Sequence, residues 1–310
     1  MKLSEEMKNK TLLSFELFPP KTEKGLQNLP GTIDHLMKYN PSYISCTYGA
    51  GGGNVGANRE VCQMIKNAGT TPVTHFTVIK NTKEGIKEQL DQYLADGVDH
   101  MLALRGDIPL GETTTCGDFD YATDLVKFVR DTYGDKFEIA VAGSPEGHIS
   151  CRSLESDIAV LKQKQDNGAD YIMTQLCWDM EQFKYWLDAI RKAGITMPVD
   201  VGVMPILDQA ATINMALSRN GCVMDRELSR MISRHWLFPN PFNPKDAEGK
   251  PFDMFYDKKV KEFKEEGIEY TIRQIDEYRA MGVNGIHLYA LNKWKDVSRI
   301  IDESGLCTLV

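Results

Sequence analysis

Long hydrophobic runs and an excess of positive charge are both missing from this 310-residue sequence. No stretch approaches the roughly 20 consecutive apolar residues of a membrane-spanning helix. The N-terminal MKLSEEMKNK also has no apolar core of the kind found in signal peptides. The formal net charge is −8, which argues against general binding to nucleic acids or to membrane surfaces. We therefore expect neither as a partner.

Closely spaced cysteines are absent as well. No two are arranged as C-x-x-C, so their spacing fits neither a disulfide framework nor a zinc site. We expect reduced thiols and a cytoplasmic location. The seven cysteines are Cys46, Cys62, Cys116, Cys151, Cys177, Cys222 and Cys307.

Apolar residues make up 42% of the chain and charged residues 26%, as in globular proteins with a sizeable core. Short apolar segments that resemble strands alternate with segments that resemble amphipathic helices. Most strand starts lie roughly 30 residues after the previous one, which is the length of a βα unit. The expected strands lie in Leu12–Pro20, Tyr43–Tyr48, Pro72–Val78, His100–Arg105, Phe137–Ala142, Tyr171–Leu176, Val199–Met204 and Gly285–Leu291.

Eight apolar strands that alternate with helices indicate a parallel sheet covered on both faces. Eight is the number that closes into a (β/α)₈ TIM barrel, which we predict as a single α/β domain over residues 1–310. A doubly wound open sheet is the alternative. The long gap before the last strand predicts helices near 209–219 and 224–234 and a charged helix from about Asp257, an elaboration between strands 7 and 8.

Glu16 stands at the end of the first strand, just before a double proline at which the strand must stop. Its neighbours Phe15, Leu17 and Phe18 are large and apolar, so we expect poor solvation. Desolvation disfavours a carboxylate and would raise the pKa of Glu16, as an acid catalyst requires. The alternative is a glutamate at a solvated strand mouth.

Polar residues recur where the expected strands end, and in a barrel these ends meet on one rim. A metal site there is disfavoured, because the chain has no H-x-H and no second histidine close in sequence to His75; we expect no metal. Each residue alone also fits a purely structural role, but their convergence favours a binding site. They are Glu16, Thr47, His75, Asp107, Gln175 and Tyr289.

Two further patterns leave alternatives open. Gly51, Gly53 and Gly56 match G-x-G-x-x-G, but the next strand lacks the acidic end that a ribose site needs, so only a turn open to a flat ligand is predicted. On the helix expected over 153–168, Asp157 and Lys164 lie two turns apart on one face. They would contact the ribose and phosphate of one ligand, or else form a solvated surface.

These residues occur in short motifs which, in this order, resemble the methylenetetrahydrofolate reductase family in its short bacterial form. The resemblance runs from Ser14 to about Lys293 and implies a (β/α)₈ barrel that carries FAD, without the regulatory domain of eukaryotic relatives. The motifs are SFELFPP (Ser14–Pro20), TYGAGG (Thr47–Gly52), ALRGDIP (Ala103–Pro109), YATDL (Tyr121–Leu125), PEGH (Pro145–His148), TQ (Thr174–Gln175) and YALN (Tyr289–Asn292).

The resemblance implies reduction of 5,10-methylenetetrahydrofolate to 5-methyltetrahydrofolate, within one-carbon and methionine metabolism. NADH or NADPH would reduce FAD in a ping-pong cycle. Glu16 would be the general acid, Asp107 would bind the pterin and tune the flavin, and Gln175 would contact the pterin. Tyr289 and Lys293 would meet the folate tail. The residues implied for FAD are Thr47, Tyr48, His75, Arg105, Gly106, Asp107, Tyr121, Ala122, His148, Asp157 and Lys164.

The chain departs from the family pattern in places that concern the electron donor. The loop 205–210 has no aromatic residue where many bacterial members have a phenylalanine, and Ser144 and Gln163 replace a common tyrosine and an occasional arginine. Stacking by a phenylalanine of the later loop is one hypothesis, with candidates Phe238, Phe242 and Phe252.

Two other functions stay open at this point. One is a pterin-dependent synthase or methyltransferase without flavin. The other is a flavin-carrying electron-transfer subunit of a larger complex, with a donor other than a pyridine nucleotide. We expect a homo-oligomer, with an electron-transfer partner subunit as the alternative.

Overall fold

The computed structural model describes residues 2–48, 55–108, 111–218, 220–236 and 256–308. Its centre is a closed barrel of eight parallel strands in sequence order, with β8 hydrogen-bonded to β1. The strands are β1 (Leu12–Leu17), β2 (Tyr43–Cys46), β3 (Thr71–Thr77), β4 (His100–Leu104), β5 (Glu138–Gly143), β6 (Tyr171–Thr174), β7 (Val199–Val203) and β8 (Gly285–Tyr289).

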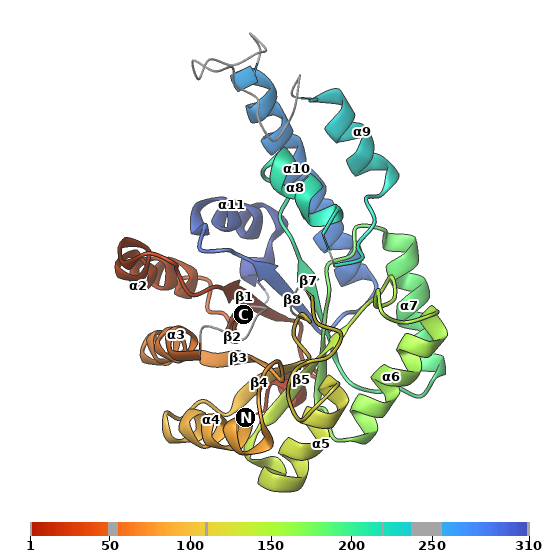
Figure 1. The fold of residues 1–310 in the computed structure, drawn as a ribbon. Helices are drawn as coiled ribbons and strands as arrows, with labels where there is room; N and C mark the ends of the chain where they lie inside the picture. The colour runs from red at the N-terminus through yellow and green to blue at the C-terminus, as the bar shows by residue number, and fades with distance from the viewer. Residues whose placement is uncertain (1, 49–54, 109–110, 219, 237–255, 309–310) are drawn as a thin grey trace.

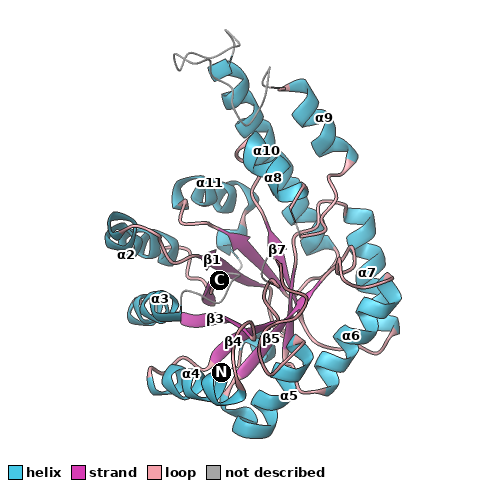
Figure 2. Cartoon of the chain, viewed as in Figure 1, coloured by secondary structure: helices cyan, strands magenta, loops and turns pink. Residues whose placement is uncertain are grey.

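Helices surround the strands as an outer ring, which Figures 1 and 2 show with the barrel seen obliquely. They are α1 (Leu3–Glu6), α2 (Glu23–Met37), α3 (Val55–Asn67), α4 (Lys83–Ala95), α5 (Ala122–Tyr133), α6 (Leu154–Asp166), α7 (Met180–Lys192), α8 (Gln209–Ala216), α9 (Arg226–Arg234), α10 (Tyr256–Ala280) and α11 (Trp294–Ser304), with 3₁₀ turns at Gly134–Lys136 and Leu306–Thr308.

The predicted (β/α)₈ barrel is therefore confirmed, and the open doubly wound sheet is wrong because β1 and β8 pair over Leu12–Glu16. Every expected strand is present, although several end earlier than predicted. β2 ends at Cys46 and β8 at Tyr289. Beyond these ends Thr47 N still donates to Leu17 O and Leu291 N to Glu16 O, before the chain enters loops. None of the helices in the described residues is long and apolar enough to span a membrane.

Side chains of each strand alternate between the barrel interior and the helix layer. On β1, Phe15 and Leu17 belong to the large apolar core beneath the helices. Leu12 instead packs inside the barrel, with Tyr43 and Tyr171. Ser14 and Glu16 have the same parity as Leu12, so their side chains also enter the interior.

A buried carboxylate closes the N-terminal end of the barrel. Both oxygens of Glu138 accept hydrogen bonds from the first backbone N–H groups of α1, at Leu3 (2.7 Å) and Ser4 (2.8 Å). Negative charge is favourable there because these N–H groups have no partner within the helix. His100 lies 3.0 Å from the same carboxylate.

The insertion between β7 and β8 consists of α8, α9 and α10, which project together from one side of the barrel (Figure 1). Its apolar cluster includes Ile213, Leu228 and Phe263, one from each helix. These three helices confirm the predicted ones. α9 starts at Arg226, because the Asp225 side chain accepts a hydrogen bond from Leu228 N at 2.7 Å and so caps the helix.

Candidate active site

A cavity of about 480 Å³ opens at the C-terminal ends of the central strands and extends between α5 and α6. Every residue predicted to bind the cofactor lines it, and so does Gln175. This convergence from separate loops is what a binding site in a barrel requires. The predicted residues along its wall are Thr47, Tyr48, His75, Arg105, Gly106, Asp107, Tyr121, Ala122, His148, Asp157, Lys164 and Gln175.

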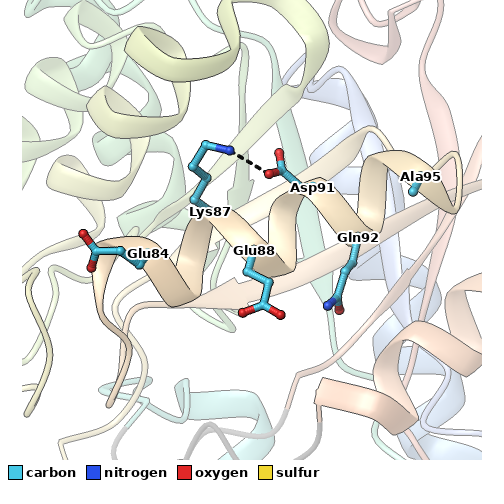
Figure 3. A pocket seen from close by; sticks show the side chains of 6 residues that line it. All are labelled: Glu84, Lys87, Glu88, Asp91, Gln92 and Ala95. Carbon is cyan, nitrogen blue, oxygen red and sulfur yellow. Dashed lines mark hydrogen bonds and ion pairs between the residues drawn. The ribbon is translucent and has the colours of Figure 1, made fainter.

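A second hollow lies on the outer face of α4 (Figure 3). All of its lining residues come from that one helix, and Lys87 is already paired with Asp91 at 2.7 Å. Exposed i,i+4 pairs of this kind are ordinary features of a helix surface. The cavity at the strand ends is therefore the candidate site.

Gly106 brings backbone close to the cavity. Its φ of +85° is the left-handed conformation that glycine adopts easily, and a Cβ there would lie 2.7 Å from Ile79 Cγ1. The residues on either side, Arg105 and Asp107, also line the cavity. Replacing Gly106 would therefore strain the turn that presents both.

The face of α6 that carries Asp157 and Lys164 forms one wall. Ser153 caps the helix by accepting from Ser156 N, and both charged side chains line the cavity. Lys164 Nζ donates to Ala142 O at 2.9 Å, and burial lowers the pKa of the ammonium although Asp157 opposes the shift. Both charged side chains thus lie on a cavity wall, and their contact with a ribose and a phosphate stays a prediction.

Two buried polar atoms on the cavity floor have no hydrogen-bond partner: His75 Nε2 and Thr77 Oγ1. Burial lowers the pKa of His75, with Glu16 opposing and His287 adding to the shift. Unpaired buried donors and acceptors are costly, and a ligand in the cavity would satisfy them.

Glu16 stands inside the barrel beside this floor, with Oε2 3.5 Å from His75 Nε2 and 3.8 Å from His287 Nε2. Burial raises the pKa of its carboxyl, but the nearby imidazoles of His287 and His75 outweigh burial and lower it. The expected rise in the pKa of Glu16 is thus wrong. Phe15 and Leu17 do not surround the carboxyl, because they point to the other face of β1.

His287 is the important site residue that the sequence did not reveal. Its ring is 1% exposed, with Nδ1 2.7 Å from Ser14 Oγ and Nε2 3.1 Å from Ser45 Oγ. The alternation of side chains along a strand could have indicated it. His287 precedes the predicted Tyr289 by two residues, so both side chains point to the same face of the strand.

Tyr289 and Lys293 lie outside the cavity lining. The Tyr289 hydroxyl donates to Thr174 O at 3.2 Å. It occupies space left by Gly202, where a Cβ would collide with the hydroxyl oxygen of Tyr289. Lys293 is exposed immediately before α11, and the structure does not bring it to Glu16. Contact of either residue with the folate tail stays a prediction.

Some predicted features fall outside the described residues: the glycine turn over 49–54 and the loop containing Phe238, Phe242 and Phe252. The insertion does contribute Asn220 to the cavity, which no motif indicated, and Ser144 lines it too. Gln209, in the loop without an aromatic residue, is buried instead against α9 and donates to Ile232 O and His235 O. Within the described ranges, no group of three or more His, Cys, Asp or Glu side chains is placed to hold a metal ion.

Residues 2–228 match the family model described as methylenetetrahydrofolate reductase. The chain belongs to the methylenetetrahydrofolate reductase family. Similar proteins include methylenetetrahydrofolate reductase (NADH) 1 of Arabidopsis thaliana, 33% identical over 96% of this chain and 48% of that protein. The 5,10-methylenetetrahydrofolate reductase of Escherichia coli is 34% identical over 65% of this chain and 67% of that protein.

The chain thus spans about half the length of the plant relative and two thirds of the bacterial one. A solved structure of an uncharacterized Clostridium thermocellum protein that binds two copies of 5-methyl-5,6,7,8-tetrahydrofolic acid covers 100% of both chains, with a TM-score of 0.65. Its 12% sequence identity makes this a likeness of fold alone.

Proposed function

We propose that this reductase-family barrel binds FAD and reduces 5,10-methylenetetrahydrofolate to 5-methyltetrahydrofolate, with NADH or NADPH as the electron donor in a ping-pong cycle. The observation that carries the proposal is the convergence of the family's motif residues on one cavity beside the Glu16 carboxyl. Family membership supports the folate reaction, and the cavity chemistry supports the flavin.

The cavity residues are suited to a flavin dinucleotide. Lys164 provides a cation for phosphate, Asp157 an acceptor for ribose hydroxyls, and Gly106 a close backbone approach. The unpartnered Thr77 Oγ1 and His75 Nε2 offer hydrogen bonds on the floor. When bound and reduced, the flavin supplies a hydride. Glu16, Asp107 and Gln175 would hold the folate beside the bound cofactor.

Glu16 would protonate a folate nitrogen and open the five-membered ring to an iminium, which a hydride then reduces to a methyl group. General acid catalysis of this kind contributes about 10²–10⁴-fold. Asp107 would accept a hydrogen bond from the pterin, and Gln175 would fix the pterin's orientation. The Glu16 carboxyl lies between His75 and His287, 3.5 Å and 3.8 Å from their Nε2 atoms.

The unpaired cysteines support the cytoplasmic location that we infer. A homo-oligomer is our expectation for the assembled protein, and its mass in solution measures this directly.

Purification followed by titration with donors separates the three functions considered. We expect yellow protein whose flavin absorbance is bleached by NADH or NADPH and restored by methylenetetrahydrofolate. Colourless protein that binds pterins would indicate a flavin-free barrel enzyme. Bound FAD that only reduced ferredoxin bleaches would indicate an electron-transfer subunit.

A further inference from the structure

A column of buried polar groups inside the barrel extends from Glu16 toward β7, and the steps above do not use it. At its far end is Asp200, which is 0% exposed. Its Oδ2 atom lies 2.6 Å from the Tyr43 hydroxyl and 3.3 Å from Ser14 Oγ. Carboxyl groups are rarely buried so fully without a functional or structural requirement.

His287 connects this carboxyl to Glu16. Ser14 Oγ contacts Asp200 on one side and His287 Nδ1 on the other, at 2.7 Å. The opposite ring nitrogen, Nε2, is 3.8 Å from Glu16 Oε2. Asp200, Ser14, His287 and Glu16 therefore form a path across three adjacent strands, β7, β1 and β8. A small rotation of the Glu16 side chain closes its last gap.

The surroundings of Asp200 suit a neutral carboxylic acid. Its Oδ1 is buried with no hydrogen-bond partner, in space that exists because residue 285 is glycine, where a Cβ would lie 2.5 Å away. Its side-chain hydrogen-bond partners among the described residues are the hydroxyls of Tyr43 and Ser14, not a lysine or an arginine. A bare anionic oxygen in such a place is costly, whereas a carbonyl-like oxygen costs far less.

We propose that Asp200 stores the proton that Glu16 delivers to folate, and that Ser14 and His287 relay it between the two carboxyls. This inference rests on the proposed function, because it explains how an acid flanked by two histidines is reprotonated. Asp200, Ser14 and His287 act through Glu16 and are positioning residues.

The transfer balances without any added reactant. When Asp200 is protonated, the Ser14 hydroxyl turns from Asp200 Oδ2, to which it donates in the structure, toward His287 Nδ1. The Asp200 Oδ2 proton then passes to Ser14 Oγ, the hydroxyl proton of Ser14 passes to His287 Nδ1, and the Nε2 proton of His287 passes to Glu16 Oε2. The result is an Asp200 carboxylate, a protonated Glu16 and the other neutral tautomer of His287. Apart from the rotation of the Glu16 side chain that closes the 3.8 Å gap to His287 Nε2, no heavy atom has to change its partner.

Several other titratable groups face the path. Tyr43, Tyr171 and Tyr289 lie near Asp200, and burial raises the pKa of each well above its ordinary range, so they stay protonated. Burial also raises the pKa of Asp200, while it lowers that of His75 beside Glu16. The pKa of Cys46, raised by burial, leaves its thiol neutral as well.

Infrared spectroscopy of the purified protein without folate tests whether the Asp200 carboxyl carries a proton. At neutral pH we expect a carbonyl band of a protonated carboxylic acid, which D200N removes and E16Q keeps. Absence of this band, or its loss in E16Q instead of D200N, would overturn the proposal. The measurement needs neither folate nor turnover, so it does not depend on the proposed reaction.

The pH profile of the folate half-reaction tests the relay. In the wild type we expect a plateau through neutral pH. In D200N and S14A the rate should fall about tenfold per pH unit there, since the protonated fraction of Glu16 follows its own low pKa. In both variants, reduction of the flavin by the donor should keep the wild-type rate. A variant that had lost its structure would lose this step as well.

S45A is the matched control, because Ser45 contacts the same ring of His287 from outside the path. We expect it to keep the wild-type profile. If D200N does not fold, S14A decides: a plateau identical to the wild type would refute the relay. A wild type that never converts methylenetetrahydrofolate would refute the proposed function, while the infrared result would still decide whether Asp200 is a store.

Discussion

The Lys164 ammonium is a buried charge without a carboxylate partner among the described residues. Its protein partner is Ala142 O, and burial lowers its pKa. A cation in such a place is partly uncompensated. An anionic phosphate at the same position would complete its surroundings.

We therefore expect K164M to weaken FAD binding about 10- to 100-fold, which corresponds to the loss of one hydrogen bond to a charged group. Flavin fluorescence quenching measures the dissociation constant. K162M is the matched control, because Lys162 lies on the same helix and pairs with Asp166 on its outer face. Equal losses in the two variants would contradict the assignment.

Individual site residues were predictable where a motif or strand end marked them, as for Thr47, Arg105 and Asp157. The surroundings of Glu16 were not, because residues adjacent in sequence point to opposite faces of a strand. His287 and Asp200 reach Glu16 from strands far along the chain. Only the register of the closed barrel brings them together.

At the scale of the element, α1 is fixed to the barrel by a short charged chain: Asp99, His100 and Glu138. His100 lies 2.6 Å from Asp99 and 3.0 Å from Glu138. Burial alone would lower the pKa of His100, but the two carboxylates outweigh it and raise the pKa to about 9. The imidazolium is therefore part of the folded structure at neutral pH.

This pKa predicts how stability depends on pH. Because the folded value of about 9 exceeds the unfolded 6.5, the stabilisation is complete below pH 6.5 and is lost as pH rises through 9. We expect a loss on the order of 3 kcal/mol in the free energy of unfolding. Denaturant titrations across this range should show it in the wild type and not in H100Q. Parallel curves for the two proteins would exclude His100 as the cause.

Strands and helices were the most predictable level of the structure. Continuous apolar segments such as Val199–Met204 identified buried parallel strands, and the helix expected over 153–168 is present as α6. Exact ends were harder, because they depend on caps such as Asp225 and on where barrel hydrogen bonds stop. α1 itself was not predicted, since its four residues have too short a pattern.

For the molecule as a whole, closure of the barrel ties the first strand to the last and places both beside the site. A ligand that contacts several βα loops then stabilises the entire barrel by mass action. At 100 times its dissociation constant, FAD should add about 2.7 kcal/mol to the free energy of unfolding.

This gain should raise the thermal midpoint by roughly 5 °C. Scanning calorimetry of the apoprotein with and without FAD measures the shift, and K164M should need proportionally more FAD to reach it. An unchanged midpoint at saturating FAD would show that the cavity does not bind the cofactor.

Reoxidation of the reduced flavin in E16Q tests the central claim most directly, because it isolates the step that needs a proton from the step that does not. In anaerobic stopped-flow experiments, NADH or NADPH should bleach E16Q at the wild-type rate. Methylenetetrahydrofolate should then restore the flavin absorbance in the wild type but at least 100-fold more slowly in E16Q. Reoxidation of E16Q at the wild-type rate would contradict the assignment of Glu16 as the acid.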